Sequence, residues 1–175
     1  MNNMKLLFVS DNHGDAAILT QIKAQFGPAV AALFHCGDSN LPESDPAMAG
    51  YLTVIGNTDW GLNYLPVISR TLEKVKVVVT HGHEYQVNTT LTPLMLLAKE
   101  QGAAIMAFGH THQLGCEVIK GTLYLNPGSI SQPRGQYAYL GGTFAVVEVT
   151  ASAFNVQYYD RNLTPVPELS FHLAR

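Results

Sequence analysis

Five short apolar segments in this chain each end at residues that can bind a metal ion. They cover residues 5–9, 31–34, 52–55, 75–79 and 103–108, and their length and largely apolar character are typical of buried strands in a parallel sheet. In open α/β sheets, ligands gather outside the carboxyl ends of the strands. Five such endings in order therefore predict that the strand ends of one sheet converge on a single metal site. The endings are Ser10-Asp11-Asn12-His13, His35-Cys36-Gly37-Asp38, Gly56-Asn57-Thr58-Asp59, Thr80-His81-Gly82-His83 and Gly109-His110-Thr111-His112.

Periodicity and turn residues predict the other elements of the fold. Residues 41–50 and 60–69 both contain proline, so we expect a loop or short helix in the first and a surface-wrapping segment in the second. Strands and helices alternate over the first two thirds of the chain and strands dominate the rest. This order favours an α/β or α+β domain with more than one sheet layer. We expect strands near 5–9, 30–35, 51–55, 75–80, 103–108, 117–119, 123–126, 143–149 and 155–159, and helices over 15–26 and 91–101.

Composition narrows the class of protein. At 175 residues the chain is expected to form one domain over 1–175. A net charge of −3 without any cluster of Lys or Arg makes nucleic acid an unexpected partner. The N-terminal segment resembles neither a signal peptide nor a membrane span, and two cysteines are too few for a disulfide framework, so we expect a cytoplasmic protein without a membrane partner. The charged fraction of 13% is low against a usual ~25%, which favours a homo-oligomer that covers part of the surface.

Each ending, taken alone, has a simpler explanation than metal binding. Asp11 or Asp38 could cap a helix or a loop, because aspartate is common where a strand leads into a helix. Asn57 could occupy a turn, which asparagine tolerates well. A single histidine such as His81 or His83 is more often a hydrogen-bonded loop residue than a ligand.

The endings together favour a metal centre over these separate explanations. His110 and His112 form the most specific pair, because alternation places both side chains on one side of an extended segment. The combined donors are carboxylate and amide oxygens and imidazole nitrogens, which suit Mn, Fe, Co, Ni or Zn as divalent ions. The set contains more donors than one ion needs, so it predicts two ions that share a carboxylate.

The five ordered endings resemble the motifs of the calcineurin-like metallophosphoesterases. The later segments Asn126-Pro127-Gly128-Ser129 and Pro133-Arg134-Gly135 narrow the resemblance to the small bacterial and archaeal phosphodiesterases of the YfcE type. The resemblance extends from residue 4 to about residue 160. It implies a two-sheet β-sandwich flanked by helices, a four-layer architecture.

The resemblance also implies how the metal ions are held and what they do. The first ion is expected on Asp11, His13, Asp38 and His112, and the second on Asp38, Asn57, His81 and His110, so that Asp38 bridges the two. The implied reaction is hydrolysis of a small-molecule phosphodiester by a hydroxide held between two divalent ions. Mn²⁺ is the expected ion, with Ni²⁺, Fe²⁺, Co²⁺ and Zn²⁺ as alternatives.

One position departs from the pattern of the larger family members, which carry a histidine directly after the metal-binding asparagine. Here that position is Thr58, and threonine cannot donate a proton as a general acid near neutral pH. General acid catalysis typically contributes ~10²–10⁴-fold. His83 is the candidate replacement, with a structural or surface histidine as the alternative, and Asp59 is expected to orient the metal-binding residues. Asn57, Asp59 and His83 are thus the candidate catalytic residues.

Four further residues received a weaker interpretation. His35 is expected to be buried against the sheet, and His172 is expected to have no role in the site. Asn126 and Arg134 could approach the pocket, where Arg134 could contact a phosphate, although a plain surface arginine explains it equally well.

Two other functions remain open at this point. The first is a non-catalytic interaction scaffold like Vps29, the retromer subunit that shares this fold with a degraded site. The complete ligand set argues against it. The second is a nuclease, which the absence of a basic surface track makes less favoured.

Overall fold

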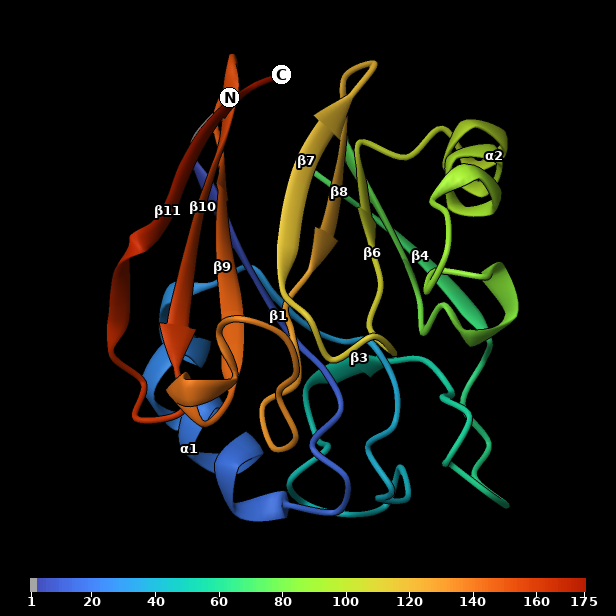
Figure 1. Ribbon diagram of the computed structural model, residues 1–175, viewed down its shortest axis with the longest axis vertical. Helices are drawn as coiled ribbons and strands as arrows, with labels where there is room; N and C mark the ends of the chain where they lie inside the picture. The colour runs from blue at the N-terminus through green and yellow to red at the C-terminus, as the bar shows by residue number, and fades with distance from the viewer. Residues whose placement is uncertain (1–2) are drawn as a thin grey trace.

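Two β-sheets pack face to face, and one α-helix covers the outer face of each sheet (Figure 1). The computed structural model describes residues 3–175. The strands are β1 (Met4–Val9), β2 (Ala32–His35), β3 (Tyr51–Thr53), β4 (Val67–Leu72), β5 (Val75–Thr80), β6 (Ile105–Ala107), β7 (Gly115–Ile119), β8 (Thr122–Asn126), β9 (Thr143–Val149), β10 (Ala153–Asp160) and β11 (Pro165–Ala174). The helices are α1 (Ala16–Phe26) and α2 (Thr92–Gln101), with short 3-10 turns η1 (Gly27–Ala29), η2 (His83–Tyr85) and η3 (Ala138–Leu140).

The first sheet has the strand order β11-β10-β9-β1-β2-β3. Strands β1, β2 and β3 run parallel, with Leu7 opposite Leu33 and Leu33 opposite Tyr51. The C-terminal strands β9, β10 and β11 extend the sheet in antiparallel fashion from the other side of β1. The carboxyl ends of three parallel strands therefore meet at one edge of this sheet.

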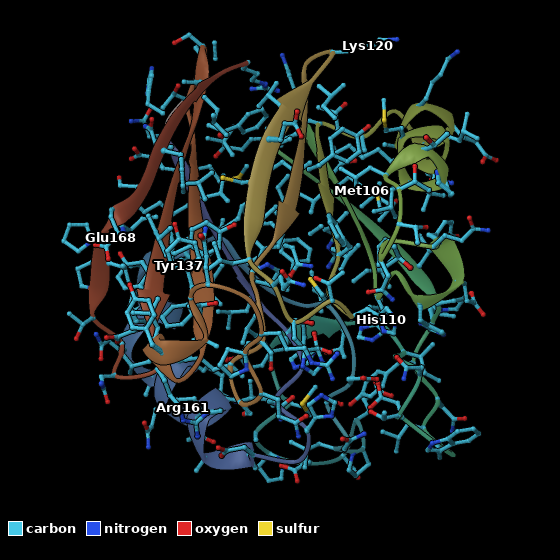
Figure 2. The ribbon with its side chains drawn as sticks, viewed as in Figure 1. Met106, His110, Lys120, Tyr137, Arg161 and Glu168 are labelled. Atoms are coloured by element: carbon cyan, nitrogen blue, oxygen red, sulfur yellow. The ribbon has the colours of Figure 1, made fainter. Side chains whose placement is uncertain are left out.

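The second sheet has the strand order β4-β5-β6-β8-β7. Strands β5, β6 and β8 are parallel, and the hairpins β4–β5 and β7–β8 complete the sheet at its two sides. The carboxyl ends of β5 and β6 lie at the same end of the molecule as those of the first sheet. Figure 2 shows His110, just after β6, at this end, and Lys120, in the β7–β8 turn, at the opposite end.

Three apolar clusters hold the four layers together. The cluster between the sheets contains Phe8, Phe34, Val77 and Ile105. The second lies under α1 and the third under α2. The predicted two-sheet sandwich flanked by helices is confirmed by this arrangement.

Three parts of the sequence-based prediction need correction. The segment 60–69 does not wrap the surface along its whole length, because Val67 begins β4 and pairs with Thr80 of β5. The C-terminal strand β11 was not predicted, because Pro165 and Pro167 lie in it. Proline lacks the N–H that a central strand needs, but it is tolerated on an edge strand, and β11 is the edge of its sheet. The single-sheet convergence was also wrong, since the five endings come from two sheets.

Helix α1 begins at a residue that also ties the helix to the C-terminal part of the chain. The Asp15 carboxylate accepts a hydrogen bond from Ile18 N at 3.2 Å, which is the usual N-cap bond. The same carboxylate pairs with the Arg161 guanidinium, which also donates to Ile130 O at 2.7 Å. Burial raises the pKa of Asp15, but Arg161 and the Ile18 N–H lower it more, so the net pKa lies below 3.8.

Within residues 3–175, no helix combines the length and the apolar composition that crossing a bilayer requires.

We expect the variant Asp15→Ala to unfold at lower urea concentration, with a loss of about 1 kcal/mol from the missing cap. Because the folded-state pKa of Asp15 is lowered, its contribution is present above pH ~4 and is lost as the pH falls through that lowered value. The difference between wild type and variant should therefore shrink in acid. A difference that is constant from pH 7 to pH 3 would contradict this account.

Candidate metal centre

The loops after β1 and β2 are joined by main-chain hydrogen bonds that continue the parallel pairing beyond the strands. Asp11 N donates to Gly37 O at 3.1 Å, and His13 N donates to Asp38 O at 3.1 Å. These bonds bring the first two endings side by side. The carboxylates of Asp11 and Asp38 are both buried as a result.

Five of the seven candidate ligands have left-handed backbone conformations, with φ between 45° and 67°. For residues other than glycine such a conformation costs of order 1–3 kcal/mol and persists only where the surrounding structure imposes it. Here the left-handed conformation breaks the alternation of side-chain directions that a strand would have, and it directs the side chains of these ligands toward the metal centre. The five residues are Asp11, His13, Asp38, His110 and His112.

Two glycines allow the sheets to approach each other at the site. A Cβ on Gly109, which follows β6, would lie 2.7 Å from Asp11 Oδ2. A Cβ on Gly37, which follows β2, would lie 2.8 Å from the His81 ring nitrogen Nδ1. Both distances are too short for real atoms, so only glycine permits this contact between the two sheets.

The Asp11 carboxylate has one satisfied and one unsatisfied oxygen. Its Oδ2 accepts hydrogen bonds from Ser10 Oγ at 2.5 Å and from His110 N at 3.3 Å. Its Oδ1 is buried and has no hydrogen-bond partner within residues 3–175. That oxygen lies 3.1 Å from Nε2 of His112 and 3.9 Å from Nε2 of both His13 and His81. A buried acceptor surrounded by three imidazole nitrogens is the arrangement that a cation between them would satisfy.

In each of these three histidines, the partner of Nδ1 determines whether Nε2 is free to bind a metal ion. His81 Nδ1 lies 2.7 Å from Cys36 O, and His112 Nδ1 lies 2.7 Å from Gln132 O. A carbonyl oxygen can only accept, so each Nδ1 carries the proton in the neutral ring and each Nε2 presents a lone pair to the site. His13 Nδ1 likewise faces the Asn40 amide oxygen at 3.2 Å. Metal-binding histidines are commonly oriented in this way.

The third ending joins the second part of the site. Asn57 Oδ1 lies 3.1 Å from His81 Nε2 and 3.0 Å from His110 Nδ1. His81 Nε2 is also 3.4 Å from Asp38 Oδ2. All seven residues predicted as ligands are therefore gathered at one place.

The donors fall into two groups that could each hold one ion. The first group is Asp11, His13 and His112, and the second is Asp11, Asp38 and His81. Only oxygen and nitrogen donors are present, which fits borderline divalent ions. In this structure Asp11 belongs to both groups, whereas the resemblance assigned the bridging role to Asp38, which stays a prediction.

The charges of the two carboxylates shift the neighbouring pKa values. Burial raises the pKa of Asp38, but its hydrogen bond with His81 and those with Thr58 lower it more, so the net pKa lies well below its ordinary value. Burial lowers the pKa of His81, but Asp38 and Asp11 raise it more. Both shifts have the same cause, the attraction between the carboxylates and a positive charge on the His81 ring.

Asp59 holds the loops of the second and third endings together. Its carboxylate accepts hydrogen bonds from the main-chain N–H groups of Asp38 at 2.9 Å, Asn40 at 2.8 Å and Gly56 at 2.7 Å. Within residues 3–175, the Asp59 carboxylate forms no hydrogen bond with the side chain of any candidate ligand. This placement fits the expected orienting role.

Thr58 and His83 occupy the positions relevant to proton donation. The Thr58 hydroxyl accepts a hydrogen bond from Asn40 Nδ2 at 2.9 Å, and its N–H donates to Asp38 Oδ1 at 2.9 Å. His83 Nδ1 is buried and has no hydrogen-bond partner among the described residues. The His83 ring centroid lies 5.3 Å from that of His81 and 6.2 Å from that of His110. Burial and the charge of His81 lower the pKa of His83.

The residues with weaker interpretations lie at different places. His35 is buried, as expected, and its Nε2 lies 2.8 Å from Asn12 Oδ1. Exposed Arg134 lies beside His112, because its main-chain N donates to His112 O at 2.9 Å. Asp11 raises the pKa of His112, and the positive charge of Arg134 opposes part of that rise. Asn126 is buried behind the last ending, where its Nδ2 donates to Gly109 O and to Thr111 Oγ1, each at 3.0 Å. His172 is exposed on β11, away from the site.

Two supporting residues were missed by the sequence interpretation. Asn40 positions His13 and also bonds Thr58 and Asp59. Ser129 donates from Oγ to Asp11 O at 2.8 Å, and so ties the loop after β8 to the first ending. The Asn126–Ser129 motif was a usable signal for the second, but nothing in the sequence distinguishes Asn40 from other loop asparagines.

Sequence comparisons connect the chain to known proteins. A profile of the calcineurin-like phosphoesterase superfamily domain matches residues 4–152. The Bacillus subtilis (strain 168) protein YsnB, a probable metallophosphoesterase, is 34% identical over 166 residues, which cover 95% of this chain and 96% of YsnB. The phosphodiesterase YfcE of Escherichia coli (strain K12) is 28% identical over 158 residues, which cover 75% of this chain and 82% of YfcE.

Solved structures show the same arrangement. A predicted phosphoesterase of Streptococcus pneumoniae TIGR4 matches with a TM-score of 0.95 at 35% identity, covering 100% of this chain and 99% of that one. Vps29 of Entamoeba histolytica, solved in complex with Zn²⁺, matches with a TM-score of 0.68 at 17% identity and 98% coverage of both chains. The second match shows a shared fold only.

We expect the variant Gly109→Ala to lose divalent metal binding, because its methyl group would lie 2.2 Å from Ser10 Oγ and 2.7 Å from Asp11 Oδ2 and would force both to move. Overpacking of this kind typically also costs ~1–3 kcal/mol of stability. Isothermal titration with Mn²⁺ and urea unfolding measure the two effects. Gly115→Ala is the matched control, because a Cβ there would meet nothing within 4 Å. Equal Mn²⁺ affinity in both variants would show that the contact between the sheets does not shape the site.

Proposed function

We propose that this chain, which belongs to the calcineurin-like phosphoesterase superfamily, hydrolyses phosphodiester bonds of small molecules with the help of two divalent metal ions. The family supports a metal-dependent phosphoester hydrolase, and the two ions and the preference for diesters are our proposal. The single observation that carries it is Asp11 Oδ1, a buried oxygen that faces three imidazole nitrogens and has no hydrogen-bond partner in the part of the chain that the structure describes. The proposed ligands are Asp11, His13, Asp38, Asn57, His81, His110 and His112.

When bound, a pair of divalent ions supplies positive charge for the phosphoryl oxygens and a nucleophilic water at neutral pH. The residues of the chain place the ions and keep the donors ready. Cys36 O, Gln132 O and Asn40 hold three imidazoles in the tautomer that can bind. Asp59 fixes the backbone that carries Asp38. Mn²⁺ is the ion we propose first, because the donors are oxygen and nitrogen without thiolate.

His83 is the proposed proton donor to the leaving oxygen. Thr58 cannot take this role, since an aliphatic hydroxyl is too weak an acid to donate a proton near neutral pH. The unpartnered Nδ1 of His83 and its position beside the rings of His81 and His110 support the assignment. Donation is expected to matter only for esters that leave poorly, because a stable leaving anion departs without a proton.

The scaffold alternative is less well supported. A protein that used this fold only for binding partners would have no need of seven gathered donors, five of them in a costly backbone conformation. The exposed Trp60 and Leu65 offer a surface for a partner or a second copy, which keeps homo-oligomerisation as a proposal.

Metal-depleted protein is expected to be inactive, and addition of Mn²⁺ should restore cleavage of bis(4-nitrophenyl) phosphate. Asp38→Ala should abolish this activity and reduce the bound metal below two ions per chain, because a proposed ligand is lost. Release of 4-nitrophenolate and elemental analysis measure the two quantities. The exposed residue Glu168 on β11 provides the control Glu168→Ala. Full metallation without turnover of any activated diester or monoester would overturn the proposal in favour of a scaffold.

We expect His83→Gln to act selectively on substrates with poor leaving groups. Loss of a proton donor typically costs ~10²–10⁴-fold, but 4-nitrophenolate leaves without one. The rate for an alkyl ester should therefore fall strongly while the rate for a 4-nitrophenyl ester stays within a few-fold. A plot of log kcat against leaving-group pKa measures this as a steeper slope in the variant. Equal losses for both esters would show that His83 has a structural role.

A further inference from the structure

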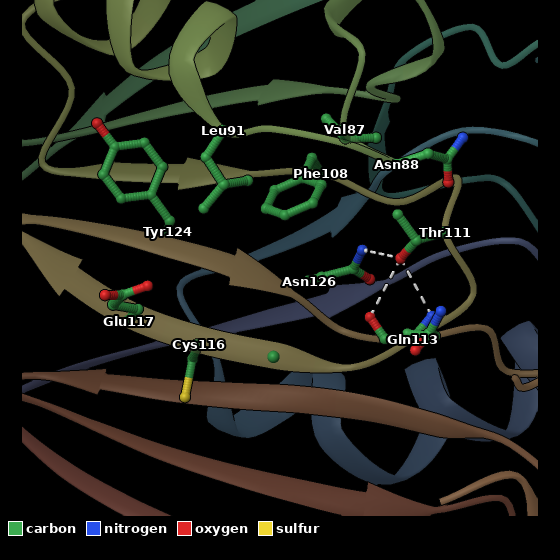
Figure 3. A pocket seen from close by; sticks show the side chains of 11 residues that line it. Val87, Asn88, Leu91, Phe108, Thr111, Gln113, Cys116, Glu117, Tyr124 and Asn126 are labelled. Atoms are coloured by element: carbon green, nitrogen blue, oxygen red, sulfur yellow. Dashed lines mark hydrogen bonds between the residues drawn. The ribbon is translucent and has the colours of Figure 1, made fainter. Parts of the chain in front are cut away.

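A pocket of about 420 Å³ lies directly behind the last metal-binding ending (Figure 3). Pockets that bind small molecules typically measure ~300–1,000 Å³. It lies on the face of the second sheet that α2 also covers, between β7, β8 and the segment after η2. None of the seven proposed metal ligands lines it.

Thr111 connects this pocket to the metal centre. It lines the pocket, whereas its two neighbours His110 and His112 point into the centre. The Thr111 hydroxyl is fixed by Asn126 Nδ2 at 3.0 Å and by Gln113 N at 3.2 Å. Thr111 therefore belongs to the wall of the pocket and is flanked along the chain by two proposed metal ligands.

The walls define what the pocket can hold. Leu91, Phe108 and Tyr124 form an apolar row along one side, and the Glu117 carboxylate lies on the other (Figure 3). Of the eleven described residues that line the pocket, Glu117 alone carries a charge. The exposed amides of Asn88 and Gln113 add further polar groups at the rim. Such walls favour a flat apolar group with hydrogen-bond donors and disfavour a second anion.

We propose that the pocket binds one of the two alcohols of the phosphodiester, an aryl or similarly flat group with hydrogen-bond donors and no negative charge. This assignment rests on the proposed function and adds the substrate class to it. Under this proposal, the residues that select between different phosphodiesters lie on β7, on β8 and in the segment that precedes α2, and the metal ligands do not take part in that selection. Gly115 determines the width of the pocket, because it lines the wall without a side chain.

Gly115 also provides the experiment. A Cβ on Gly115 would meet nothing within 4 Å, and phenylalanine suits a strand, so Gly115→Phe should fill the pocket without disturbing the fold. The assay compares kcat/KM for phenyl 4-nitrophenyl phosphate and methyl 4-nitrophenyl phosphate, each corrected by its rate with hydroxide in solution. A well-fitted apolar group is worth ~10–200-fold. We expect the wild type to prefer the phenyl ester by about 10-fold or more, and Gly115→Phe to lose that preference while its methyl ester rate stays unchanged.

Thr71→Phe is the matched control, because Thr71 is exposed on β4 of the same sheet and does not line the pocket. The control should keep the wild-type preference. An unchanged preference in Gly115→Phe, with both esters still cleaved, overturns this inference and leaves the proposed function intact. Failure of the wild type to cleave even the methyl ester overturns the proposed function, and the substrate assignment with it.

A binding measurement tests the pocket without turnover. Tyramine, an aryl alcohol with an ammonium group, should shift the amide resonances of Gly115 and Leu91 in the wild type and not those of Leu91 in Gly115→Phe. The anionic 4-hydroxybenzoate should shift neither, and Glu117→Gln should improve its binding. Equal shifts by both compounds, or none by tyramine, would overturn the charge preference or the site itself.

Discussion

The pairing of β1 with β2 continues past the strands as main-chain hydrogen bonds between their loops, and the rest of the site depends on it. These bonds place two carboxylates, Asp11 and Asp38, together in a buried position. Two buried like charges are unfavourable unless cationic groups face them. The imidazoles from the second sheet supply that environment only partly, since Asp11 Oδ1 finds no hydrogen-bond partner among the described residues. The negative charge of the two carboxylates is therefore only partly neutralised at this edge of the sandwich, and a divalent cation would neutralise it.

The backbone around these carboxylates is strained as well. Left-handed conformations at several donors, together with contacts between sheets that only Gly37 and Gly109 permit, are costs that a purely structural loop would avoid. They are offset by the apolar clusters above the site and by hydrogen bonds such as those to Asp59. Stability is thus supplied by the layers of the fold, and the strain is concentrated where the donors meet.

Much of this could be predicted from the sequence, and the limits have physical causes. Short apolar runs and periodic spacing predicted most strands and both helices, and the ordered endings predicted the seven candidate ligands that the structure brings together, but not the supporting residues Asn40 and Ser129. Strand β11 escaped because prolines conceal an edge strand. The role of Asn40 escaped because it depends on a left-handed backbone and on partners from two other loops. The pocket behind Thr111 escaped because it is formed by segments far apart in the chain.

The donors come from both halves of the sandwich: Asp11, His13, Asp38 and Asn57 follow strands of the first sheet, and the remaining histidines follow β5 and β6 of the second. Ions held by them would link two sheets that otherwise pack together through non-directional apolar contacts. Sliding of one sheet over the other would move the ligands apart, so the geometry of the metal site depends on the rigidity of the whole sandwich. By mass action, occupation of the site would then stabilise the contact between the two sheets.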